Sequence, residues 1–189
     1  MKRFKTLRSR LASARSNPPA AGVLETSVAV LLSPGPAGFE VLFIRRAVRE
    51  DDPWSGHIGL PGGRRDPADT GLFETSIRET REEIGVSLTP ESFLGALDDL
   101  APSSPSPIPL MIRPFVFGLP ERPPTQTSAE VAASYWVPLD SLHAARGCAT
   151  VSLREKSLKV PCFLVPGLPE GLVVWGLTYR ILNGLLPLI

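Results

Sequence analysis

Residues 62–86 read GGRRDPADTGLFETSIRETREEIGV and carry the main structural signal in this chain. They predict a helix over 71–84, which Gly85 ends in the left-handed conformation that glycine tolerates. At about 100° per residue, three carboxylates share one arc of this helix, and Glu82 and Glu83 are both expected to face away from the core. A separate stripe of side chains is typical of a helix face packed on a core: Phe73, Ile77, Thr80 and Ile84.

Three acids on one helical turn, Glu79, Glu82 and Glu83, repel one another at a cost of about 0.2–0.5 kcal/mol per pair. Pairing between Arg78 and Glu82 offsets part of this repulsion, whereas a divalent cation would offset more. Mg²⁺ prefers oxygen ligands and commonly sits between carboxylates and phosphates. The alternative is that the acids form only a solvated helix face, but this does not explain why the glycine pair and Arg78 accompany them.

The glycine pair Gly62-Gly63 precedes this helix. Because glycine has no side chain, it lets a phosphate and the backbone approach the helix start closely. Asp69 or Thr70 is predicted to cap that start. The sequence therefore predicts a phosphate-binding and metal-binding region at this helix.

The composition excludes several classes of protein. The 189 residues contain 20 Lys plus Arg and 19 Asp plus Glu, and the net charge of +1 gives no support for a protein that coats nucleic acid. No run of about 18 uncharged apolar residues is present, so no membrane-spanning helix is expected. Cys148 and Cys162 are too far apart for a CxxC metal pair and are expected to be free thiols.

The first 16 residues are basic and contain no acid. Phe4, Leu7 and Leu11 have helical spacing, and the prolines at 18 and 19 end the pattern. We interpret residues 1–22 as a basic N-terminal helical extension, docked through these apolar side chains, and residues 23–189 as a single domain. An organelle transit peptide and a phosphate-contacting arm are the alternatives.

The rest of the chain predicts more strands than helices. Residues 26–32 and 39–44 flank a Pro-Gly turn and predict a hairpin. The further expected elements are strands at 57–60, 93–100, 111–117 and 134–137, a hairpin of 151–154 with 160–165, and a helix at 172–186. Pro114 places its strand at a sheet edge or at a bulge. The expected fold class is α+β with a mixed sheet.

The segment Arg78-Glu79-Thr80-Arg81-Glu82-Glu83-Ile84-Gly85-Val86 resembles the second half of the signature of the Nudix hydrolases. In the first half, the spacing from Gly63 to Arg78 is one residue longer, and Asp69 or Thr70 replaces an early glutamate. The resemblance implies a Nudix-like α/β/α sandwich with a mixed β-sheet. It also implies a pyrophosphatase that cleaves a diphosphate linking a nucleoside to another group, with Mg²⁺ or Mn²⁺ as cofactor.

One subset of this family, the coenzyme A diphosphatases, is more similar still. Residues 56–63, GHIGLPGG, are similar to the motif that precedes the signature in that subset, with Leu60 in place of phenylalanine. The expected substrate is coenzyme A or a thioester of it, giving 3′,5′-ADP and 4′-phosphopantetheine. The alternatives are hydrolysis of ADP-ribose, a nucleotide sugar or an oxidised nucleotide, and a non-catalytic nucleotide-binding module.

The resemblance also implies roles for individual residues. Arg78 would orient a carboxylate, and the general base would be Glu79 or, as second choice, Glu130. The implied metal ligands are oxygen donors beside the glycine pair: the Gly62 carbonyl, Glu79, Glu82 and Glu83. The implied substrate contacts are a glycine and basic side chains: Gly63, Arg45, Arg46, Arg64 and Arg65. Trp54 is expected either to stack on a base or to pack within the protein.

The expected partner is a small nucleotide. Neither nucleic acid nor stable membrane association is expected, since the net charge is small and the basic N-terminus lacks a second anchoring signal. A homodimer is compatible with the sequence. The expected location is the cytoplasm, with organelle import through residues 1–16 as the alternative.

Overall fold

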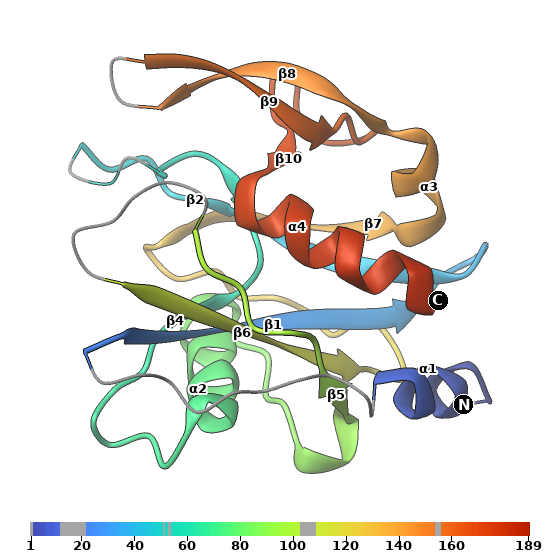
Figure 1. The fold of residues 1–189 in the computed structure, drawn as a ribbon. Helices are drawn as coiled ribbons and strands as arrows, with labels where there is room; N and C mark the ends of the chain where they lie inside the picture. The colour runs from blue at the N-terminus through green and yellow to red at the C-terminus, as the bar shows by residue number, and fades with distance from the viewer. Residues whose placement is uncertain (1, 12–21, 51, 53, 103–108, 154–155) are drawn as a thin grey trace.

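The computed structural model describes residues 2–11, 22–50, 52, 54–102, 109–153 and 156–189. Figure 1 shows strands between helices. The helices are α1 (Lys2–Leu11), α2 (Leu72–Ile84), α3 (Leu139–Ala144) and α4 (Gly176–Leu185), with 3₁₀ turns η1 (Pro90–Ser92) and η2 (Leu186–Leu188). The strands are β1 (Leu24–Pro34), β2 (Phe39–Arg46), β3 (Ile58–Gly59), β4 (Gly62–Arg64), β5 (Phe93–Ala96), β6 (Leu110–Gly118), β7 (Val131–Pro138), β8 (Arg146–Leu153), β9 (Lys156–Phe163) and β10 (Val174–Trp175).

A mixed sheet forms the centre of the molecule. Its main path runs β3-β2-β1-β6-β5, with β4 paired to β1 and β7 paired to β2. Strands β1 and β6 are parallel, with Leu24 opposite Leu110, and the other pairs are antiparallel. The predicted first hairpin is confirmed, since Leu32 of β1 lies opposite Val41 of β2. A second sheet, β10-β9-β8, contains the predicted second hairpin.

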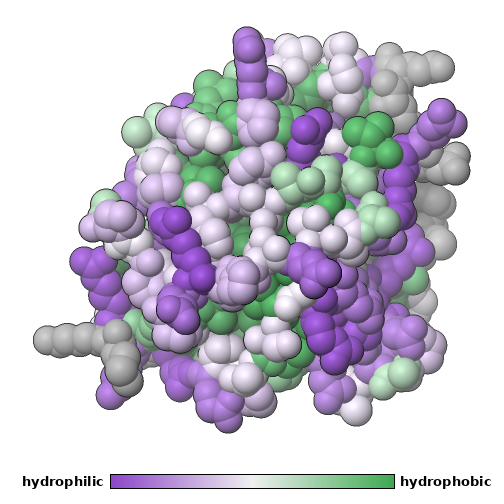
Figure 2. All heavy atoms as spheres, turned by 180° about the vertical axis from the view of Figure 1, so that it is seen from behind, coloured by the Kyte–Doolittle hydropathy of each residue, from purple (hydrophilic) through white to green (hydrophobic). Residues whose placement is uncertain are grey.

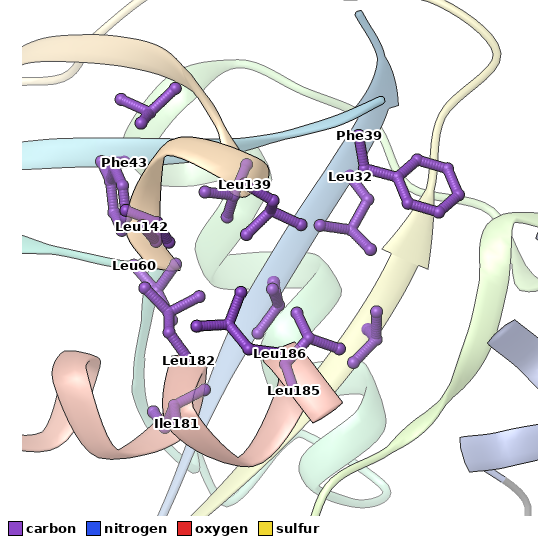
Figure 3. Close-up of a cluster of buried hydrophobic side chains, with 14 of the residues drawn as sticks. Leu32, Phe39, Phe43, Leu60, Leu139, Leu142, Ile181, Leu182, Leu185 and Leu186 are labelled. Atoms are coloured by element: carbon purple, nitrogen blue, oxygen red, sulfur yellow. The ribbon is translucent and has the colours of Figure 1, made fainter. Parts of the chain in front are cut away.

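Side chains of the central sheet alternate between its two faces. On β1, Ala29 and Leu31 belong to the apolar cluster that includes α2 residues, whereas Val30 and Leu32 belong to the cluster that includes α4 residues. Figure 3 shows the α4 side, where apolar side chains of α4 meet those of the strands and α3. The expected α+β class and α/β/α layering are therefore confirmed.

Helix α1 packs on the same side as α4. Leu7 and Leu11 are buried in the α4-side cluster, and the rings of Phe4 and Phe39 stack with their centres 5.0 Å apart. The helical spacing of these apolar residues thus predicted the docking face of α1. The division of the chain after residue 22 stays a prediction.

Pro114 does not lie at a sheet edge, and the sequence prediction for it is wrong. Strand β6 lies between β1 and β5, and the register shift falls between Phe93 and Gly95 of β5 rather than at the proline. The ladder with β5 extends only to Ala96, so it does not require an N–H from Pro114. The Pro114 carbonyl still accepts a hydrogen bond of 2.9 Å from the N–H of Leu97.

Several element boundaries also differ from the predictions. Residues 62–64 form β4, a strand that was not predicted, because they pair with β1. Strand β7 and the β8–β9 hairpin are longer than predicted. The C-terminal helix begins later, at Gly176, because Val174 and Trp175 pair with β9.

The surface seen from behind mixes hydrophilic and hydrophobic residues (Figure 2). A dense hydrophilic patch lies at the lower right of that view. The 180° rotation from the view of Figure 1 brings α2 to this region. Within the described ranges of the chain, no helix combines the length and the apolar character needed to cross a membrane.

Candidate active site

Helix α2 carries the acidic segment, and its two ends are set by glycines. Gly85 adopts the left-handed conformation (φ 71°), and its N–H donates to the Arg81 carbonyl, so the predicted helix end is confirmed. Gly71 stands at the start without a side-chain cap, which means that the predicted cap by Asp69 or Thr70 is wrong. The side chain of Asp69 is directed to Arg78 instead.

Small residues let α2 approach the sheet closely. Thr75, Ser76 and Thr80 are fully buried on the sheet-facing side of the helix. A Cβ atom at Gly62 would lie 2.2 Å from the Ser27 carbonyl oxygen, and one at Gly63 would lie 2.4 Å from Oε1 of Glu79. At Gly62, where φ is 154° and the nearest neighbours are backbone atoms, only glycine fits, whereas a side chain at Gly63 would displace the Glu79 carboxylate. The glycine pair thus brings backbone atoms directly against the acidic side of α2.

Glu83 is the most buried of the three acids, with 4% of its surface exposed. Its Oε2 accepts a hydrogen bond of 2.9 Å from the Gly62 N–H. Burial raises the pKa of Glu83 to about 7. The expectation that Glu83 faces away from the core is wrong, because β4 pairs with β1 and covers this side of the helix.

Glu79 and Glu82 differ in their environments. Burial raises the pKa of Glu79, whose side chain is only 17% exposed. Glu82 is solvated, with 53% of its side chain exposed. The three carboxylates therefore form a gradient from protein interior to solvent along one helix face.

Arg78 joins two of these acids. Its Nη1 donates to Oε1 of Glu79 at 2.9 Å and to Oε2 of Glu82 at 3.0 Å, which confirms the predicted pairing with Glu82. Its Nη2 donates to the Arg64 carbonyl at 3.1 Å. The arginine thus links the acidic turn of α2 to strand β4.

Asp69 is a site residue whose role the sequence did not reveal. It is buried and accepts hydrogen bonds from Arg78, from the Asp66 N–H (2.9 Å) and from Thr75 Oγ1 (2.8 Å). The hydrogen bond from Arg78 is the main cause that lowers the pKa of Asp69 to about 2. The sequence did contain a signal for this residue. The loop before α2 is one residue longer than in the Nudix signature, and Asp69 lies near the position of the early glutamate of that signature.

Glu130, just before β7, faces the same region. Its Oε1 accepts a hydrogen bond of 3.1 Å from Arg49 in the loop between β2 and β3. Burial is the largest cause of the raised pKa values of Glu79 and Glu83, and the negative charge of Glu130 is a smaller cause in the same direction. Glu130 is therefore close enough to the acidic turn to act on it electrostatically.

The basic candidates divide into two groups. Arg46 lies near the acids, since its positive charge opposes the rise in the pKa of Glu83, and it pairs with Asp52 at 2.6 Å. Arg45 lies opposite Ile58, which belongs to the α4-side cluster, so the structure does not bring Arg45 to the α2 face. Its Nε is buried, and no residue that the structure describes forms a hydrogen bond with it.

Two further arginines lie at the end of β4. Arg64 is exposed and reaches the site through its carbonyl, which accepts from Arg78. Arg65 is engaged with Glu25 at 2.8 Å. Gly63, the predicted substrate contact beside them, lies directly against the carboxylate of Glu79.

The donor set suits a hard cation, because the acids supply carboxylate oxygens, of which Mg²⁺ takes one or two alongside substrate phosphates. In the part of the chain that the structure describes, no three His, Cys, Asp or Glu side chains are grouped to hold a metal ion. In this structure Arg78 contacts Glu79 and Glu82, and Glu83 accepts from the Gly62 N–H.

Comparisons with known proteins agree with the fold. The NUDIX domain model matches residues 23–154. An uncharacterized protein of Schizosaccharomyces pombe is 42% identical over 107 residues, which cover 54% of this chain and 32% of that protein. The human protein named mitochondrial coenzyme A diphosphatase NUDT8 is 35% identical over 83 residues, which cover 44% of this chain and 33% of that protein. The chain thus spans about a third of the length of these two relatives.

Solved structures share the fold. A MutT/nudix family protein from Enterococcus faecalis superimposes with a TM-score of 0.59 at 17% identity, covering 98% of this chain and 66% of that chain. The NUDIX domain of NrtR from Shewanella oneidensis, solved with ADP ribose, gives a TM-score of 0.53 at 24% identity, covering 72% of this chain and 85% of that chain. With a family model that matches well over half of the sequence, the chain belongs to the Nudix hydrolase family.

Proposed function

We propose that this chain is a divalent-metal-dependent diphosphatase whose substrate is a nucleoside diphosphate linked to another group. The observation that carries the proposal is the placement of Glu79 and Glu83 against Gly63 and Gly62. Burial raises the pKa of both carboxyl groups, so their ionised forms gain most from a nearby cation. A surface helix that merely carried acids would leave them in water.

Metal binding at this turn would involve Glu79, Glu82 and Glu83, with the Gly62 carbonyl as a further candidate. A bound Mg²⁺ or Mn²⁺ would neutralise charge on the phosphoryl oxygens and lower the pKa of the attacking water. Arg78 would turn from a partner of Glu79 and Glu82 into the group that orients them, because Asp69 and the Arg64 carbonyl hold it from the other side.

In the proposed reaction, a water oxygen bonds to one phosphorus as the bridging P–O bond breaks, and the other phosphate leaves. One carboxylate accepts the proton of the water. Glu79 is the first candidate for this base, because it is largely shielded from solvent and close to the glycine pair. Glu130 is the second candidate, and it must first be released from Arg49.

We propose coenzyme A or one of its thioesters as the substrate. Two observations favour it: the partial motif at residues 56–63, and the similarity to the human protein named as a coenzyme A diphosphatase. Coenzyme A carries a 3′-phosphate besides its diphosphate, and it therefore needs additional basic contacts. Arg46 and Arg64 are exposed enough to supply them, whereas Arg45 would have to act from the other face of the sheet.

The test is incubation with coenzyme A and Mg²⁺ or Mn²⁺, followed by chromatography of the products. We expect 3′,5′-ADP and 4′-phosphopantetheine, and no product in the presence of a chelator. Parallel reactions contain ADP-ribose, a nucleotide sugar and an oxidised nucleoside triphosphate. Cleavage of one of these instead of coenzyme A would overturn the assignment of coenzyme A as the substrate. If neither coenzyme A nor any of these compounds is cleaved, a non-catalytic binding module is favoured.

The remaining expectations are separate from this reaction. A homodimer, a cytoplasmic location and an import function of residues 1–16 stay predictions. Light scattering of the purified chain and localisation of a fluorescent fusion with and without residues 1–16 would test them.

A further inference from the structure

The loop between β2 and β3, described at residues 47–50, 52 and 54–57, lies between the acidic site and a group of aromatic side chains. From this loop, Arg49 reaches Glu130, and Asp52 accepts hydrogen bonds from Arg46. In the chain trace the loop runs beside the second sheet (Figure 1), and the backbone of Ser152 in β8 hydrogen-bonds to His57. The same loop therefore borders both the carboxylates and the β8–β9 hairpin.

Trp54 is presented on this loop with 46% of its surface exposed. One side of the indole is packed: the ring centre of Trp175 lies 5.6 Å away at 40°, and that of His57 lies 6.4 Å away at 71°. Trp175 is itself buried and contacts His57 at 5.2 Å. A single exposed apolar residue is common on protein surfaces. The Trp54 indole differs because one side packs on a second, buried indole, so its position is held while part of the ring remains exposed.

The backbone at Trp54 is linked to the phosphate side of the site. The backbone N–H of Trp54 donates to Oδ1 of Asp52 at 2.9 Å, and Oδ2 of the same carboxylate accepts from Arg46 at 2.6 Å. Arg46 in turn acts electrostatically on Glu83. Hydrogen bonds thus link Arg46 through Asp52 to the backbone of Trp54, and the charge of Arg46 acts on Glu83 in the acidic turn of α2.

We propose that Trp54 is the stacking surface for the purine base of the nucleotide whose diphosphate lies at the acidic turn. This inference rests on the proposed function and assigns the base-recognition residue of that site. Every base offers a π-face, and stacking on an aromatic side chain strengthens binding about 5- to 150-fold. Arg46, whose side chain is 40% exposed and is held by Asp52 of the same loop, would contact a phosphate of the same nucleotide.

A flat, uncharged ligand fits this surface better than a charged one. Burial lowers the pKa of His57, which keeps the imidazole neutral near pH 7, so the three rings present no net charge. The charged groups that face His57 are Asp52 and Arg46, and they neutralise each other in their ion pair. An aromatic ring linked to phosphates matches both the apolar indole and the adjacent arginine.

The experiment measures binding of adenosine 3′,5′-bisphosphate to the full chain without metal, by two-dimensional NMR of the three tryptophan indole N–H groups. Assignment uses the Trp54→Phe variant, which lacks one signal. We expect the ligand to shift the Trp54 signal most and the Trp175 signal next. Inorganic pyrophosphate, which has no base, should leave both indole signals in place.

The variants give the quantitative test. Trp54→Ala should bind adenosine 3′,5′-bisphosphate about 5- to 150-fold more weakly, whereas Trp54→Phe should keep most of the affinity. Val48→Ala, in the same loop and at a residue that is 77% exposed, is the matched control and should bind like the wild type. Wild-type affinity in Trp54→Ala, or no indole shift in the wild type, would overturn the proposal.

Two further outcomes separate this inference from its alternatives. If Trp54→Ala changes the oligomeric state in solution, the indole belongs to an interface between copies and the proposal fails. If the wild type binds adenosine 3′,5′-bisphosphate through Trp54 but cleaves no nucleoside diphosphate derivative, the proposed activity fails while the base-stacking assignment stands.

Discussion

The carboxylate of Asp69 and the guanidinium of Arg78 form a paired contact, Nε to Oδ1 and Nη2 to Oδ2, each 3.0 Å long. Such a fork fixes the plane of the guanidinium as well as its position. Because Nη1 of the same group contacts Glu79 and Glu82, Asp69 determines where two of the three acids can point. Asp69 is thus a positioning residue, acting through Arg78 from a loop nine residues earlier.

Replacing Asp69 by asparagine should impair catalysis more than folding. The amide keeps the shape but cannot accept both donors of Arg78, so the unfolding free energy should fall by about 1–3 kcal/mol. Displacement of Arg78 by about 1 Å should lower kcat by roughly 10- to 100-fold. Asp66→Asn, at an exposed acid of the same loop, is the control. Equal kcat values for the two variants would contradict the positioning role.

The Asp69–Arg78 pair also predicts how stability depends on pH. The pKa of Asp69 is about 2 in the folded protein, below its ordinary value of 3.8, so the ionised form favours folding. This contribution is complete above about pH 4 and is lost as the pH falls through about 2. Denaturant unfolding between pH 6 and pH 2 should show a smaller loss of stability in Asp69→Asn than in the wild type. Parallel curves would show that the carboxylate is not specially stabilised.

Glu83→Gln should separate metal binding from folding. The glutamine oxygen can still accept from the Gly62 N–H, and no buried charge remains, so the melting temperature without metal should not fall. Activity should drop by about 100-fold or more, as it does when a charge-stabilising group is removed. The rise in melting temperature on adding Mg²⁺ should shrink. Glu74→Gln, on the same helix but away from the site, should respond to Mg²⁺ like the wild type.

Gly63→Ala tests the close approach between β4 and α2. The new Cβ would meet the Glu79 carboxylate, whose flexible end would have to move away, so activity should fall while stability decreases by about 1–3 kcal/mol at most. Gly59→Ala is the matched control, since no atom in the described part of the chain lies within 4 Å of its Cβ position. Thermal melts and turnover assays on both variants decide the point: full activity in Gly63→Ala would show that the gap is not needed.

The local patterns of the sequence predicted more than its long-range pairings did. The stripe from Phe73 to Ile84 and the end at Gly85 were correct because both depend on residues within a few turns. The burial of Glu83 was missed because it results from β4, whose pairing with β1 joins segments more than thirty residues apart. Likewise, the partner of Asp69 could not be read from the loop alone, since it required the loop to fold back along α2.

The strand and helix ends were predicted poorly for a related reason. Val174 and Trp175 have the apolar character of the helix that follows, and only their pairing with β9 makes them a strand. Pro114 signals an edge or a bulge by its missing N–H, but it lies within β6, between β1 and β5, where the ladder with β5 requires no N–H from it. In both cases the local structure depends on which other segment lies alongside, and a single stretch of sequence does not specify that segment.

The packing of α1 leads to the last prediction. A Cβ at Gly95 would lie 2.5 Å from the Cβ of Leu11, and one at Gly118 would lie 2.8 Å from the Phe4 ring, so both strands have glycine where the helix approaches. Leu11→Ala should therefore lower the unfolding free energy by about 2–5 kcal/mol. Lys5→Ala, an exposed position on the same helix, should change it by less than about 0.5 kcal/mol.

Removal of residues 1–11 should be more damaging than either substitution, because it uncovers the apolar surface around Leu7 and Leu11 together with the glycine positions beneath them. Denaturant unfolding of the shortened chain is the measurement, with the full chain carrying Lys5→Ala as the reference. A docked helix predicts a lower midpoint and exposed apolar surface that binds a hydrophobic dye. If residues 1–11 are instead a dispensable basic extension, such as a leader that is cleaved after import, the midpoint should not change. That result would mean that the contacts of α1 with β5 and β6 contribute nothing to stability.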